Sequence, residues 1–121
     1  MPDEVPTPES SAASARAARR QEDTARFIDR FAVLTGIRMQ STSIEGLPRE
    51  FLARVVTAPD ALVREYGYEF EPRTRNALCR YEPGRQPERW TFGRLLEIRG
   101  FGVFSLLDVL EVLAKHGIKS T

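Results

Sequence analysis

The sequence predicts an all-α fold: a small helical bundle that ends in a helix-hairpin-helix, with an N-terminal helical extension. Three observations support this prediction. Several segments carry apolar residues at the spacing of an amphipathic helix, glycine and proline separate these segments, and no segment alternates apolar and polar residues as a strand does. We divide the chain into a disordered tail over residues 1–22, a helical extension over 23–67 and a final domain over 68–118.

The first 22 residues are predicted to be a tail because they contain proline, serine and alanine but few large apolar side chains. Such a segment cannot bury enough surface to offset the entropy lost on ordering. The stretch Ala12–Arg20 does have good helix propensity, so a fraying helix could extend backward from the domain.

Three helices are predicted in the extension. The first spans Thr24–Leu34, where Phe27, Ile28, Phe31 and Leu34 share one face, and Gly36 is a plausible stop. The second begins at Leu47–Pro48 and presents an apolar stripe of Phe51, Leu52, Val55 and Val56. The third spans Pro59–Tyr66 and ends at Gly67.

The final domain is predicted to contain three more helices, over Glu71–Tyr81, Phe92–Glu97 and Val103–Lys115. A turn-rich loop over Glu82–Pro87 separates the first two. Thr91 can cap the second helix, and Gly117 can end the third. The third helix carries the broadest apolar face in the chain.

A double-glycine turn connects the last two helices. Gly100 and Gly102 allow the backbone to turn sharply and to adopt positive φ, and Phe101 between them would tuck into the core. The amides at the start of the following helix point outward with the positive end of its dipole, which suits an anion such as a nucleic-acid phosphate. The alternative is a plain helix-to-helix turn that binds nothing.

The distribution of charge indicates an anionic partner better than the net charge of +1 does. Residues 72–99 hold seven arginines and three glutamates, and only Lys115 and Lys119 are lysines among the 18 basic residues. The planar donor fork of arginine suits phosphate or carboxylate. A codon bias toward arginine would produce the same composition.

Catalytic and metal-binding functions are not expected. With one cysteine and one histidine, Cys79 and His116, the chain has no internal disulfide and no clustered zinc site. It has no glycine-rich nucleotide loop and no nucleophile elbow. We therefore predict no enzyme, no catalytic residues, no metal and no cofactor.

Three individual side chains have two interpretations each. We expect Cys79 to be a small buried residue rather than a reactive thiol, and His116 to interact with a helix C-terminus. Trp90 with Tyr81 would suit stacking on a base, although packing in the core is the commoner role.

No apolar run is long enough to span a membrane, and the N-terminus lacks the pattern of a secretory signal. We expect no membrane partner and a cytoplasmic, prokaryotic location, with association to the nucleoid as one possibility.

Three motifs stand in a recognisable order. Residues 73–78 read Arg-Thr-Arg-Asn-Ala-Leu, residues 91–96 read Thr-Phe-Gly-Arg-Leu-Leu, and residues 98–106 read Ile-Arg-Gly-Phe-Gly-Val-Phe-Ser-Leu. In this order they resemble the C-terminal domain of the bacterial RNA polymerase α subunit, over about Phe70–Ile118. That family is a small helical bundle that ends in a helix-hairpin-helix, binds A/T-rich DNA in the minor groove and contacts transcription activators.

The resemblance implies a set of DNA-binding residues. Arg73 matches the minor-groove arginine, Asn76 its neighbouring phosphate or sugar contact, Gly102 the glycine whose amide approaches the backbone, and Ser105 a hydroxyl that contacts phosphate. These roles suit a narrow minor groove, whose enhanced negative potential attracts arginine. Gly100 at the turn and Arg80 beside the first motif complete the predicted interface.

Two positions depart from the family. Phe104 and Cys79 stand where it usually has lysine, so we expect weaker DNA affinity unless Arg75, Arg80, Arg94 or Arg99 compensates. An exposed Val103–Phe104 pair would instead suit a protein contact. The two functions under consideration are a module that binds double-stranded DNA, and a helical adaptor that docks on RNA polymerase or another protein subunit.

Overall fold

The computed structural model describes residues 8–80 and 89–119, with side chains from Ser14 onward. The α-helices are α1 (Pro8–Thr35), α2 (Arg49–Leu52), α3 (Pro59–Tyr66), α4 (Pro72–Leu78), α5 (Phe92–Leu96) and α6 (Val103–Lys115), and two 3-10 helices, η1 (Ile44–Gly46) and η2 (Gly67–Glu69), join them. These residues contain no strand, only an isolated bridge between Val55 and Thr91. The all-α prediction is confirmed.

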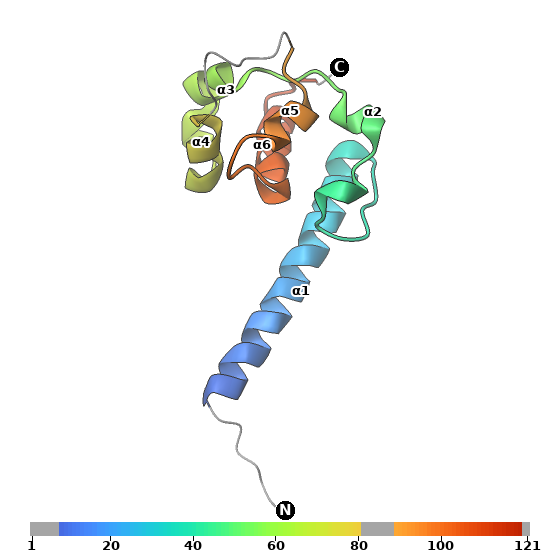
Figure 1. The fold of residues 1–121 in the computed structure, drawn as a ribbon, viewed down its shortest axis with the longest axis vertical. Coiled ribbons are helices and arrows are strands. Elements are labelled where there is room, and N and C mark those ends of the chain that lie inside the picture. Colours follow the sequence, from blue (N-terminus) through green and yellow to red (C-terminus); the bar gives the residue numbers. More distant parts are fainter. Residues whose placement is uncertain (1–7, 81–88, 120–121) are drawn as a thin grey trace, which may run out of the picture.

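Helix α6 lies at the centre of the fold, and α1, α4 and α5 all pack against it (Figure 1). Its sequence explains this position, because apolar residues occupy most of its circumference and only a narrow strip is left for solvent. The buried residues of α6 are Val103, Ser105, Leu106, Val109, Leu110, Val112 and Leu113.

One hydrophobic cluster joins the segments 23–67 and 68–118. A row of aromatic rings crosses between them: the ring centroids of Phe31 and Phe51 are 5.4 Å apart, and those of Phe51 and Phe92 are 4.6 Å apart in a stacked pair. Because these rings are fully buried and come from α1, α2 and α5, neither segment has a complete core by itself.

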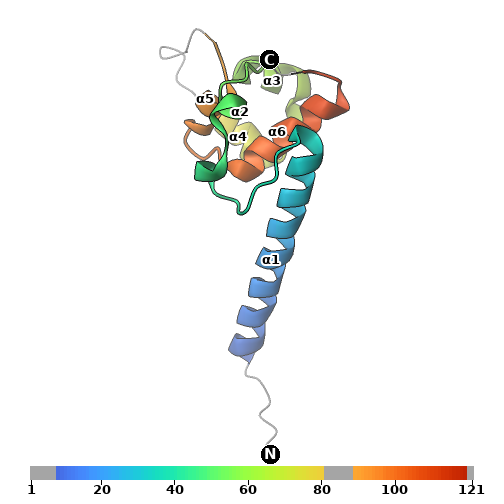
Figure 2. The same ribbon diagram turned by 90° about the vertical axis from the view of Figure 1, so that its right-hand side faces the viewer.

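Helix α1 begins at Pro8, far before the Thr24 start that the sequence predicted, so residues 8–22 are helical rather than a disordered tail. The alanine and arginine content of this stretch accounts for the helix. Figures 1 and 2 show this half of α1 extending away from the body, and every side chain from Ser14 to Asp23 is exposed.

Several boundaries in the body agree with the sequence prediction. Helices α3 and α6 span the predicted ranges, Thr91 Oγ1 accepts a hydrogen bond from Arg94 N at 3.2 Å, and Gly36 and Gly117 end helices at φ of 77° and 66°. The end of the predicted helix at Tyr81 and the turn-rich loop Glu82–Pro87 lie outside the described residues.

The second helix is shorter than predicted. α2 stops at Leu52, because the following residues pair with the segment before α5: Val56 N donates to Trp90 O at 2.9 Å and Phe92 N donates to Arg54 O at 3.3 Å. This short ladder draws Val55 out of the helical stripe.

Candidate nucleic-acid interface

Helix α4 presents three of the predicted DNA-binding residues to solvent. Arg73, Asn76 and Arg80 are spaced by three and four residues and are all exposed, with Arg80 just beyond the end of the helix. The opposite face of α4 buries Thr74, Ala77 and Leu78. Because the apolar side anchors α4 to the body, the three polar side chains point away from it together.

The end of α4 lies against the double-glycine turn. A Cβ added to Gly100 would be 2.9 Å from Arg80 Nη1, so this guanidinium rests on the glycine. At the other end of α4, Glu71 N donates a hydrogen bond to Asp108 Oδ2 at 2.8 Å. These two contacts hold α4 along α6 and bring Arg80 to the turn that precedes α6.

The two glycines of the turn differ in conformation. Gly100 has a φ of 86°, which a residue with a side chain rarely adopts, whereas Gly102 is extended at a φ of −115°. The sequence predicted positive φ for this turn, and only Gly100 has it. Phe101 is buried between them, as predicted.

The start of α6 carries uncompensated positive charge. Gly102 is its N-cap, with no side chain to accept from the first amides, and the first turn contains no acidic residue. The first hydrogen bond of the helix runs from Leu106 N to Gly102 O at 2.9 Å, so the amides of residues 103–105 have no partner within the helix. Such a helix end attracts anions.

Two predicted contacts at this helix start are wrong. The side chain of Ser105 is only 3% exposed, so it cannot offer its hydroxyl to a phosphate, and Val103, at 6%, is not part of an exposed pair. Both residues face the core because α6 is packed on more than one side at its start. Phe104 alone is exposed, at 47%, and its ring lies 5.2 Å from that of Phe27 in α1.

The remaining arginines near this surface differ in their availability. Arg94 Nη1 is bonded to Glu97 Oε2 at 3.1 Å, so its charge is partly satisfied. Arg73, Arg80 and Arg99 have no ion-pair partner in the part of the chain that the structure describes. Of the arginines expected to compensate for the missing lysines, Arg80 therefore has the best position.

Cys79 is exposed, which contradicts the expectation of a buried thiol. It follows α4 directly, and the turn there directs its side chain outward while Leu78 faces the core. Trp90 is partly buried against the core, the commoner of its two predicted roles, and Tyr81 lies outside the described residues.

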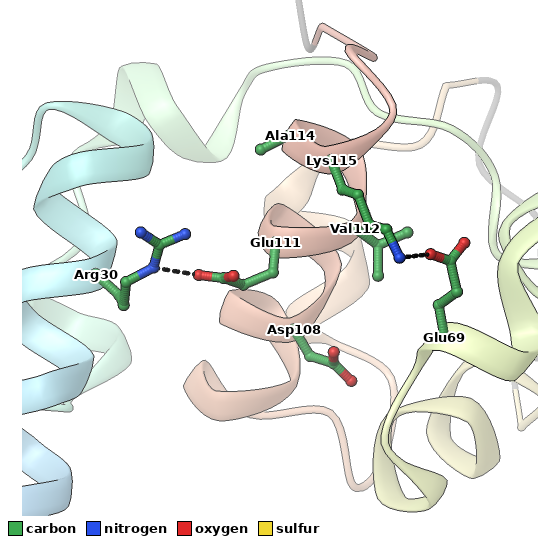
Figure 3. A pocket seen from close by; sticks show the side chains of 7 residues that line it. All are labelled: Arg30, Glu69, Asp108, Glu111, Val112, Ala114 and Lys115. Atoms are coloured by element: carbon green, nitrogen blue, oxygen red, sulfur yellow. Dashed lines mark hydrogen bonds and ion pairs between the residues drawn. The ribbon is translucent and has the colours of Figure 1, made fainter.

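A second cluster of charged residues lies along α6, in a hollow of about 500 Å³ (Figure 3). Arg30 Nε of α1 and Glu111 Oε1 are 2.5 Å apart, and Lys115 Nζ is 2.7 Å from Glu69 Oε1 of η2. These pairs tie α1 and η2 to opposite sides of α6. The sequence analysis missed them because their partners are far apart in the chain.

Glu69 contacts two basic side chains, Lys115 and His116. Its second oxygen, Oε2, is 2.6 Å from His116 Nε2, and the His116 ring lies 4.5 Å from that of Tyr66. The hydrogen bond from Lys115, followed by the one from His116, lowers the pKa of Glu69 below its usual value of 4.5. His116 does lie at the end of α6, as predicted, and its side chain contacts the Glu69 carboxylate.

The hollow in Figure 3 is better explained as a structural clamp than as a catalytic centre. Of its three carboxylates, Glu69 and Glu111 are paired with cations and Asp108 accepts from the backbone of α4. No group of three or more histidine, cysteine or acidic residues that could hold a metal is present within residues 8–80 and 89–119. Within the same ranges, no helix has the length and apolar character needed to cross a bilayer.

Comparison with known proteins returned no match: no protein-family model fits the chain, and no curated protein or solved structure is similar to it.

Proposed function

We propose that this chain is a non-enzymatic DNA-binding module that contacts the minor groove and the phosphate backbone in transcription or another DNA transaction. The observation that carries the proposal is the position of Arg80 on Gly100, because it joins the exposed face of α4 to the turn before α6. In this proposal the interface comprises Arg73, Asn76 and Arg80 of the α4 segment together with the amides at the start of α6.

Each part of this surface suits a different part of a duplex. The amides at the start of α6 suit a phosphate, because the helix dipole and the absence of an acidic side chain leave positive charge there. Arg73 and Asn76 project from a separate helix and suit the edge of the groove. The resemblance of this segment to the RNA polymerase α C-terminal domain agrees with the same assignment.

Duplex titration at two salt concentrations tests the proposal. The full chain is titrated with a labelled A/T-rich duplex at about 50 mM and about 200 mM salt, beside Arg73→Ala and Arg80→Ala. We expect binding that weakens with salt, and an approximately tenfold loss of affinity in each variant, equivalent to about 1.4 kcal/mol. Arg49→Ala, at an exposed arginine on α2, is the control and should bind as the unaltered chain does.

Duplexes of different base composition distinguish the proposed groove contact of Arg73 from the proposed backbone contact of Arg80. Arg73→Ala should reduce the preference for A/T-rich over G/C-rich duplex, whereas Arg80→Ala should lower the affinity for both duplexes by the same factor. If the unaltered chain binds no duplex at low salt, the proposal is wrong.

A helical adaptor is the second candidate, and the exposed ring of Phe104 is the observation that favours it. The ring borders an apolar hollow of about 290 Å³ that Phe27 and Leu107 also line. This function predicts no duplex binding at low salt together with a stable complex with a polymerase subunit or another protein, which size-exclusion chromatography would detect and Phe104→Ser would disrupt.

A further inference from the structure

The first half of α1 extends away from the body and carries three arginines, Arg16, Arg19 and Arg20, and Arg26 follows where the helix reaches the body. Arg16, Arg19, Arg20 and Arg26 are exposed, and none has an ion-pair partner in the described part of the chain. A helix of this kind gains nothing from tertiary packing, and an isolated segment of this length is marginally stable in water. The side chains it presents therefore indicate what it binds.

The four arginines lie on one side of the helix. Successive residues of an α-helix are rotated by about 100°, which places these four within an arc of about 120°. Phe27 falls inside the same arc, and Phe27 is one of the two fully buried residues, with Phe31, through which α1 packs on the body. The arginine side of α1 is thus the continuation of its packing face beyond the edge of the body, as the course of α1 in Figures 1 and 2 indicates.

This side of α1 meets the body at the start of α6. The rings of Phe27 and Phe104 are 5.2 Å apart, and Phe104 is the second residue of α6, two positions after Gly102. The hollow at this corner is lined by Asp23, Arg26, Phe27, Arg30, Phe104 and Leu107. The free amides of α6 and the nearest arginine of α1 therefore flank the same corner of the molecule.

We propose that the arginine side of α1 is a second contact surface for the phosphate backbone of double-stranded DNA, continuous with the surface at the start of α6. The inference rests on the proposed function, which supplies the duplex. Between Arg16 and Arg26, the four arginines share their side of the helix with one acidic residue, Asp23, while Glu22 lies outside the arc, so the net charge of this stretch is positive there.

With this second surface, the protein contacts a longer stretch of the duplex. Arg16 and Arg26 are ten positions apart, which corresponds to about 15 Å along α1 at a rise of about 1.5 Å per residue. That distance equals about four base pairs at a spacing of roughly 3.4 Å. A duplex of about 16 base pairs should therefore bind more tightly than one of about 8, beyond the statistical effect of length.

A triple substitution tests the inference. We expect Arg16→Ala, Arg19→Ala and Arg20→Ala together to lower affinity for the longer duplex at least tenfold, and to reduce the slope of log K against log salt by about 2.7 units for three lost phosphate contacts. Alanine favours helix, so circular dichroism should show the same helix content. The corresponding triple lysine variant keeps the charge and should keep most of the slope.

A second variant removes the negative charge of Asp23, which should strengthen DNA binding where the triple alanine variant weakens it. Asp23→Asn should tighten binding of the longer duplex about threefold and leave binding of the shorter one unchanged, because the shorter duplex does not reach α1.

The outcomes distinguish this inference from the proposed function. Suppose that Arg80→Ala weakens binding but the triple alanine variant keeps the affinity and salt slope of the unaltered chain. The inference that α1 contacts DNA is then wrong, and the proposal of a DNA-binding module stands. If the unaltered chain binds no duplex, both are wrong. If the chain binds polyglutamate as tightly as duplex, with the same loss in the triple variant, α1 recognises an acidic protein and the inference is also overturned.

Discussion

Arg80 and Gly100 form the contact on which the proposed interface depends. The guanidinium occupies the space that a side chain at position 100 would need, and the positive φ of Gly100 makes that position unsuitable for other residues. A single pair therefore links the geometry of the turn to the position of a side chain in the proposed interface.

Replacing Gly100 tests this link. Gly100→Ala should lower the free energy of unfolding by about 1–2 kcal/mol, because alanine is strained at a φ of 86°. It should also displace Arg80 and weaken duplex binding. Chemical denaturation and duplex titration measure the two effects, and Gly36→Ala is the control, since it shares the positive φ but has open space around it. Equal duplex affinity in both variants would contradict the role of the Arg80 contact.

Glu69 determines a second property at the scale of single residues, the dependence of stability on acid. Its pKa is lowered in the folded chain, so folding is favoured while Glu69 is ionised, above the unfolded value near 4.5. This contribution is lost as the pH falls below 4.5 and through the lower folded pKa. Glu69→Gln should therefore show a smaller loss of stability between neutral pH and this acidic range, measured by urea unfolding. Parallel pH profiles for the two chains would show that the carboxylate contributes nothing.

At the scale of elements, α6 has two roles that conflict. Its apolar sides form the centre of the core, and its first turn has neither a capping side chain nor an acidic residue to satisfy its amides. A protein selected for stability alone would cap this helix, because serine, threonine or aspartate at an N-cap is more favourable than glycine. The glycine at position 102 leaves the amides accessible to a ligand.

Capping this helix should separate the two roles. Gly102 has open space around it and an extended backbone, so Gly102→Ser fits without strain and can accept from the free amides. We expect a melting temperature that is equal or slightly higher and a duplex affinity several-fold lower, because the serine hydroxyl competes with phosphate. A gain in both quantities would indicate that the helix start does not bind DNA.

At the scale of the whole molecule, the core combines residues from both ends of the chain. The final domain that the sequence predicts begins at residue 68, yet the buried rings Phe27, Phe31 and Phe51 lie before it. Burial of one such side chain contributes about 1.5–3 kcal/mol, so the three together contribute an amount comparable to the whole stability of a small domain.

Truncation tests the extent of the folding unit. A chain of residues 23–121 keeps the whole core and should unfold cooperatively, within a few degrees of the full chain. A chain of residues 68–121 should show no cooperative thermal transition by circular dichroism. A folded 68–121 fragment would mean that the preceding helices are an addition to an independent domain.

The sequence alone was sufficient for the properties that depend on near neighbours. Helical periodicity predicted the all-α class and the ends of α3 and α6, and the hydroxyl of Thr91 predicted a cap that the structure contains. Each of these features is determined by bonds and contacts within a few residues.

Tertiary structure alone decided which sides of those helices meet solvent. Contrary to expectation, Ser105 and Val103 are buried, because segments distant in sequence cover their sides of α6. Also contrary to expectation, Cys79 is exposed, because the packing of the chain leaves its side chain facing solvent. The same holds for the contact between Arg80 and Gly100. Local periodicity describes a helix face, but the long-range packing of the chain decides whether that face is core or surface.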